Sequence, residues 1–159
     1  MEFELVYRGS QMLNPFDLRT VLLAKHAQHV VLIHFPIALF ITGVSFDLLS
    51  SGKRESQLAC AAYLNLCGAA VTILPTIVTG VLAWHFAFGG ETLNGLLRLH
   101  FIAASLATVL VMTAWWTHWR ARKSRVISLP RYRVPIELLG VAAIGLTAHL
   151  GGFLSGLNA

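Results

Sequence analysis

Residues 58–88, LACAAYLNLCGAAVTILPTIVTGVLAWHFAF, contain no Asp, Glu, Lys or Arg. A helix needs about 20 apolar residues to cross a hydrocarbon core about 30 Å thick, so this stretch predicts a transmembrane helix that tilts or extends past the bilayer. Three more apolar stretches are long enough to span, at 30–50, 96–119 and 134–157. Only 12% of all residues are charged, about half the share typical of soluble domains. We therefore expect an all-α integral membrane protein, a four-helix up-down bundle forming a single domain over residues 1–159.

The first 27 residues precede the first span. They lack the basic start and apolar run of a signal peptide. Within 15–27, apolar and charged residues occur at helical spacing, after Asn14 as a cap and with Pro15 at the first helical position. We expect residues 1–27 to form an interfacial segment with a short helix on the membrane surface. A frayed lead-in to the first span is the alternative.

Basic residues predict the orientation of the chain in the membrane. Six of the twelve Lys and Arg residues crowd the connection between the third and fourth spans: Arg120, Arg122, Lys123, Arg125, Arg131 and Arg133. The positive-inside rule places this connection in the cytoplasm and both termini in the periplasm of a bacterial inner membrane. The high pI thus reflects topology. We expect this loop to contact anionic lipid head groups, and we do not expect the protein to bind nucleic acid.

Histidines gather at the opposite membrane face. Five of the seven lie near span ends that share this face in an up-down bundle: His29, His34, His85, His100 and His149. Histidine is costly inside a bilayer and usually marks function. Because helix contacts in membranes favour small residues, a histidine that shares a helical face with Gly, Ala or Ser is expected to point inward.

Three histidines meet this criterion, namely His34, His100 and His149. His85 lies roughly opposite the small and hydroxyl-bearing face of its span and is held as a fourth candidate, since a kink at Pro75 would shift its phase. We expect His29 and His118 at membrane interfaces, where a histidine needs no special explanation. Ordinary packing, with each ring bonded to a neighbouring hydroxyl or carbonyl, is the alternative for the three.

Paired histidines on facing helices are how bundles hold haem. If the spans follow one another around the bundle, His34 and His100 lie on diagonal helices, as two axial ligands would, with His149 as an alternative ligand or a neighbour of a propionate. The chain has no C-x-x-C-H motif, so the haem would be non-covalent haem b. Another tetrapyrrole would also fit, as would a single zinc or copper ion held by these three histidines.

Two carboxylates, Asp47 and Glu137, lie deep within the spans toward their cytoplasmic ends. We expect them to pair with nearby Arg and Lys. A part in proton uptake is the alternative.

The run HVVLIHFPIA at residues 29–38 is the most specific string in the chain. With Thr79-Gly80 and the run LGGFL at 150–154, it resembles a bacterial family of four-helix predicted membrane proteins of unknown function, over roughly residues 26–157. His29, His34 and Pro36 match the first-span signature, whereas His85 stands where an acidic residue often follows the Thr-Gly step. The resemblance implies four spans and an association with respiratory or redox membrane proteins, and it implies no activity.

These observations lead to one main hypothesis and two rivals. The main one is a small membrane b-type cytochrome or redox subunit that carries electrons near the periplasmic face of a respiratory-type complex. The rivals are a non-redox accessory subunit of a respiratory or photosynthetic complex, and a three-histidine metal-handling membrane protein. With no nucleophile–base pair and no phosphate loop, we expect no self-contained enzyme. The expected partners are membrane lipids and other membrane subunits or a redox partner.

Overall fold

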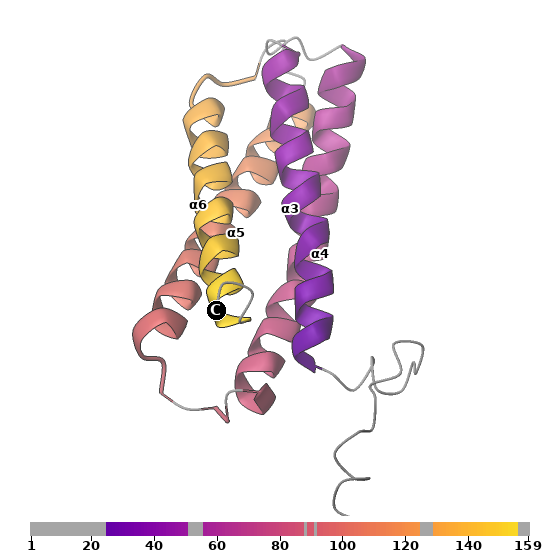
Figure 1. Cartoon of the computed structure of the whole chain (residues 1–159). Coiled ribbons are helices and arrows are strands. Elements are labelled where there is room, and N and C mark those ends of the chain that lie inside the picture. The colour runs from indigo at the N-terminus through magenta and orange to yellow at the C-terminus, as the bar shows by residue number, and fades with distance from the viewer. Residues whose placement is uncertain (1–24, 51–55, 88, 91, 125–128, 156–159) are drawn as a thin grey trace, which may run out of the picture.

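The described part of the chain forms four helices, labelled as in Figure 1. The computed structural model describes residues 25–50, 56–87, 89–90, 92–124 and 129–155. The helices are α3 (Lys25–Leu49), α4 (Gln57–Ala87), α5 (Gly95–Lys123) and α6 (Arg133–Leu154). Each is long and apolar enough to cross a membrane, and the described residues include no strand. The predicted all-α, four-span fold is confirmed, while the surface helix expected within residues 1–27 falls almost wholly outside the described residues.

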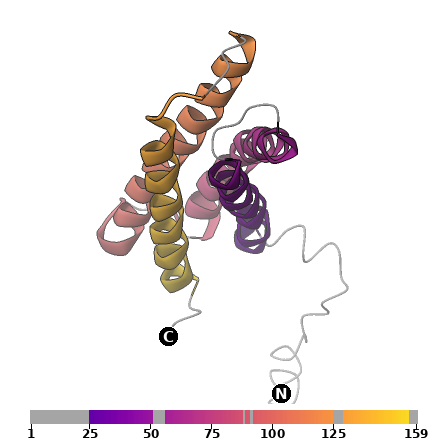
Figure 2. The ribbon, with the colours of Figure 1, turned by 90° about the horizontal axis from the view of Figure 1, so that it is seen from above.

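The helices follow one another around the bundle (Figures 1 and 2). α3 packs most extensively on α4, α5 packs on α6, and the two pairs meet through α4–α5 and α3–α6 contacts. This order makes α3 diagonal to α5, as the haem hypothesis requires. We call the end where α5 finishes with Arg120, Arg122 and Lys123 the basic end. The opposite end, where α3 and α5 begin, is the histidine end.

The core lies between these helices and is filled by Phe40 and Val44 of α3, Leu66 of α4 and Val111 of α5. Phe40 is completely buried because Gly140 of α6 lies against it. A Cβ atom at Gly140 would stand 2.7 Å from Phe40 Cζ. The missing side chain therefore sets how closely α6 approaches α3, as small residues do in membrane bundles.

The outer surface and the polar side chains also suit a bilayer. Large apolar side chains are exposed on all four helices, among them Val31, Leu74, Leu106 and Leu139. Hydroxyls within the spans are bonded to carbonyl oxygens of the preceding turn, as in Thr108 Oγ1 to Ala104 O at 2.8 Å. A helix can thus satisfy its polar groups without water.

Candidate functional site

A cluster of ionisable side chains is buried near the basic end of the bundle. His118 Nε2 of α5 forms a 2.8 Å hydrogen bond with Glu137 Oε1 of α6. The same nitrogen lies 3.9 Å from Asp47 Oδ1 of α3. The first residue of α6, Arg133, donates from Nε to Asp47 Oδ2 at 2.6 Å. Asp47 and Glu137 are 0% exposed, His118 2% and Arg133 7%. Three helices therefore converge on one sealed polar centre, which we call the buried cluster.

Local sequence positions each member of the buried cluster. Asp47 follows Phe40 and Val44 on the inward face of α3, near the C-terminal end of that helix. Arg133 and Glu137 stand four residues apart on α6, so they share a face. That same face continues to Gly140 against the core. The helix-packing contact that buries Phe40 thus also brings the two carboxylates together.

Two oxygen atoms in the buried cluster have no hydrogen-bond partner among the described residues, namely Asp47 Oδ1 and Glu137 Oε2. Two carboxylates and one guanidinium, with a neutral imidazole, carry one net negative charge. Burying an unbalanced charge is costly. The cluster therefore calls for one more positive charge, supplied by a proton shared between His118 and Glu137 or by a bound cation.

His118 lies near the basic end, as expected, but its ring is buried and not exposed as an interfacial histidine would be. A signal for this was in the sequence: His118 follows His100 by 18 residues, or about five turns at 3.6 residues per turn. It therefore lies on the same small-residue face of α5, with Ala107 and Ala114. For the carboxylates, Asp47 does pair with an arginine as expected, whereas Glu137 pairs with histidine.

The four sequence-predicted site histidines come from four different helices. His100 is half-buried at the histidine end, while His34, His85 and His149 are exposed. His34 does share its face with Ala38, but that face of α3 points away from the core, and His149 shares an exposed face of α6 with Ala142 and Gly145. The inward orientation expected for His34 and His149 is therefore wrong. Within the described residues, the only close group of three potential metal ligands is Asp47, His118 and Glu137. The structure therefore does not assemble the three-histidine site.

Hydrogen bonds define the ring geometry of two of these histidines. His100 Nδ1 lies 3.2 Å from Thr147 O of α6, and His34 Nδ1 lies 2.7 Å from Val30 O of its own helix. A carbonyl oxygen can only accept, so each Nδ1 donates and each neutral ring keeps its lone pair on Nε2. Gly151 of α6 also faces His100, where a Cβ atom would lie 3.2 Å from Cε1.

His29 is half-buried between α3 and α4, and not simply interfacial. Its Nδ1 lies 3.2 Å from Thr79 Oγ1. A Cβ atom at Gly80 would stand 3.0 Å from His29 Cε1, so the glycine leaves space for the ring. Three residues that carry the family resemblance, His29, Thr79 and Gly80, therefore meet in one contact at the histidine end.

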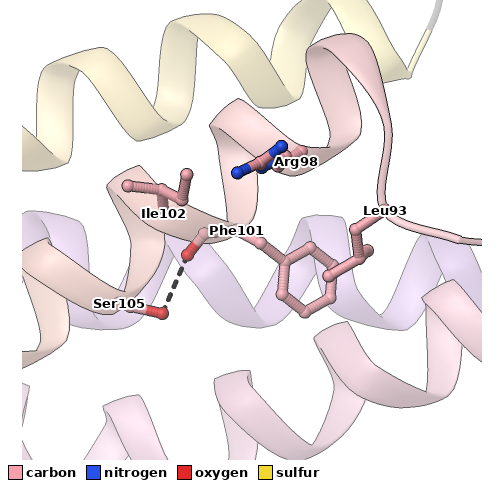
Figure 3. Close-up of a pocket in the computed structure, with 5 residues that line it drawn as sticks. All are labelled: Leu93, Arg98, Phe101, Ile102 and Ser105. Atoms are coloured by element: carbon pink, nitrogen blue, oxygen red, sulfur yellow. Dashed lines mark hydrogen bonds between the residues drawn. The ribbon is translucent and has the colours of Figure 1, made fainter.

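A surface pocket of about 490 Å³ lies along α5 near the histidine end. Figure 3 shows its lining: Leu93, Arg98, Phe101, Ile102 and Ser105. Ser105 Oγ donates to Phe101 O at 2.8 Å, within its own helix. The remaining lining is mainly apolar with one cation, which suits contact with a lipid.

Comparison with known proteins gives a family but no activity. No curated protein and no solved structure matches the chain. A family model described as predicted membrane protein (DUF2231) matches residues 25–156, a range that includes all four described helices and the buried cluster. The chain therefore belongs to the predicted membrane protein family DUF2231.

Proposed function

We propose that this protein is a small b-type membrane cytochrome, a redox subunit that carries electrons near the periplasmic face of a membrane complex. The observation that supports this best is the setting of His100. Its ring is half-buried at the histidine end, with Nδ1 directed at Thr147 O. Metal-binding histidines commonly bond the other ring nitrogen in this way, which fixes the tautomer and the ring orientation. Nε2 of His100 is then the nitrogen that would ligate the haem iron.

A second residue to hold the haem would come from α3, the helix diagonal to α5. His34 has the same tautomer as His100, since its Nδ1 donates to Val30 O, but its ring is exposed. His29 stands near the start of α3 and is half-buried. The sequence pattern favours His34 as this second ligand, whereas burial favours His29. We therefore assign one ligand to His100 and the other to one of these two residues of α3. His149 and His85, both exposed, are the remaining candidates.

The haem itself would supply one-electron chemistry, and the chain would hold it and exclude water. Electron partners would be other membrane subunits or a redox protein. The basic connections, facing the cytoplasm under the positive-inside rule, would place the histidine end on the periplasmic side of a bacterial inner membrane.

One spectrum of the purified protein tests this function. After haem-replete expression, we expect a reduced-minus-oxidised difference band typical of haem b, with no covalent attachment. No such band would reject the proposal in favour of the non-redox accessory subunit. A pigment spectrum without iron would identify another tetrapyrrole. Bound zinc or copper that is lost in His100→Ala and retained in His118→Gln would identify the three-histidine metal protein.

Single substitutions then assign the ligands. His100→Ala should abolish the band, and one of His29→Ala and His34→Ala should do the same, which identifies the ligand on α3. His118→Gln is the matched control, since it changes a histidine of the same helix at the basic end and should leave the band intact. Equal loss in His118→Gln and His100→Ala would contradict the ligand assignment.

A further inference from the structure

We propose that Asp47, His118 and Glu137 form a binding site for one divalent first-row transition-metal ion. One ligand atom of each residue lies within 4.8 Å of the other two. The site does not depend on haem and stands at the other end of the bundle. His118 and His100 are 18 residues apart on α5, or about 27 Å at 1.5 Å per residue.

The spacing of these atoms suits a small metal ion. Metal–ligand bonds of about 2.1 Å put neighbouring ligand atoms roughly 3.0–3.4 Å apart in octahedral or tetrahedral geometry. The two distances from His118 Nε2, 2.8 Å to Glu137 Oε1 and 3.9 Å to Asp47 Oδ1, bracket this range. Small side-chain rotations would therefore bring the three ligands to bonding distance.

The unpartnered oxygens point to the same occupant. Asp47 Oδ1 and Glu137 Oε2 are completely buried and accept no hydrogen bond among the described residues. Arg133 occupies only Oδ2 of Asp47, at 2.6 Å, which orients that carboxylate and leaves Oδ1 to bind. Support of a ligating carboxylate by a second residue is common around metals.

Charge and ligand chemistry define the class of ion. With neutral His118, the buried cluster carries one net negative charge, so it favours a cation. Two carboxylates and one imidazole suit manganese, iron(II), cobalt or zinc better than calcium, which takes only oxygen ligands. Metal binding through His118 Nε2 requires that nitrogen to carry no proton, so the ion would take the place of the proton that His118 and Glu137 otherwise share.

The test uses the full chain in detergent, in a background where the exposed His34, His85 and His149 are alanine so that they bind no metal. Because the buried cluster is sealed, Mn²⁺ or Co²⁺ is supplied both during expression and after purification. We expect about one retained ion per chain, measured by elemental analysis, and pulsed EPR coupling between Mn²⁺ and an imidazole nitrogen. Glu137→Gln and His118→Gln should each weaken retention more than about tenfold, and His118→Gln should remove the coupling.

Thr117→Ala is the matched control, because its hydroxyl is bonded to Thr113 O within α5, and it should retain the metal. If either cluster variant does not fold, the nitrogen coupling of the parent protein still decides. No retained metal, no nitrogen coupling, or equal retention in Glu137→Gln would overturn the proposal and leave the cluster as a site of a shared proton. In the otherwise wild-type protein, the haem band should be unchanged in His118→Gln, and in the background without His34, His85 and His149 metal retention should be unchanged in His100→Ala, so the two proposals fail separately.

Discussion

Replacing Arg133 by methionine tests how charge is balanced inside the bundle. The side chain is 7% exposed, and its Nε donates to Asp47 Oδ2 at 2.6 Å. Methionine keeps an unbranched, flexible side chain and removes the charge. In Arg133→Met, Asp47 and Glu137 would share the cluster with only the His118 ring to balance them.

The expected loss follows from that imbalance. Removing one partner of a buried ion pair costs about 3–5 kcal/mol, and we expect this loss in the free energy of unfolding of Arg133→Met. Asp47→Asn should cost less, about 1–3 kcal/mol, because the amide oxygen still accepts from Arg133 and Glu137 still offsets its charge. Replacing both partners, Asp47→Leu with Arg133→Met, should recover most of the loss, since well-packed apolar substitutes for a buried pair are often neutral.

Unfolding of the purified protein in mixed detergent micelles, followed by circular dichroism, measures these differences. The matched control is Arg131→Met, which removes an exposed arginine two residues earlier and should change stability by less than about 0.5 kcal/mol. A loss in Arg133→Met no larger than in Arg131→Met would refute the reasoning. So would an Asp47→Leu and Arg133→Met double variant that is no more stable than Arg133→Met alone.

Two further predictions concern packing and topology. Gly140→Ala should destabilise the fold by about 1–3 kcal/mol, because the new Cβ would lie 2.7 Å from Phe40 Cζ. Gly145→Ala on the same helix is the control: its Cβ would meet nothing within 4 Å, so this variant should be neutral or stabilising. Equal melting temperatures of the two variants would contradict the close approach of α6 to α3. With the native cysteines replaced, a membrane-impermeant maleimide should label Asn94→Cys in intact cells and Arg131→Cys only after lysis, and the reverse pattern would invert the predicted orientation.

Much of the fold was predictable from hydrophobic length alone. The four apolar stretches became four helices, with α3 beginning earlier than residue 30 and α5 continuing past residue 119 to Lys123. These extensions carry polar residues, which a hydropathy pattern excludes although the helix continues through the interface. Hydrophobicity thus locates the part of a helix in lipid and not its ends.

The candidate site was harder to predict, because it depends on which way each helix faces. Small residues marked the inward face of α5 correctly, including Ala103 and Ala107. The same rule failed on α3, where the inward face carries Phe40 and Asp47 while Ala38 and His34 are exposed. A small residue is inward only when another helix lies over it, and a single sequence does not show where neighbouring helices lie.

The sequence by itself determined the membrane class and the four spans, because the cost of exposing polar groups to lipid is a local property of each segment. It also marked His100, whose helical face is consistently small. Only the tertiary structure decided that Asp47, His118, Arg133 and Glu137 meet, since this requires three helices to be rotated toward one point by core contacts such as Phe40 on Gly140. The sequence determines how deep in the membrane each residue of a helix lies, whereas packing against neighbouring helices determines the rotation of that helix about its axis.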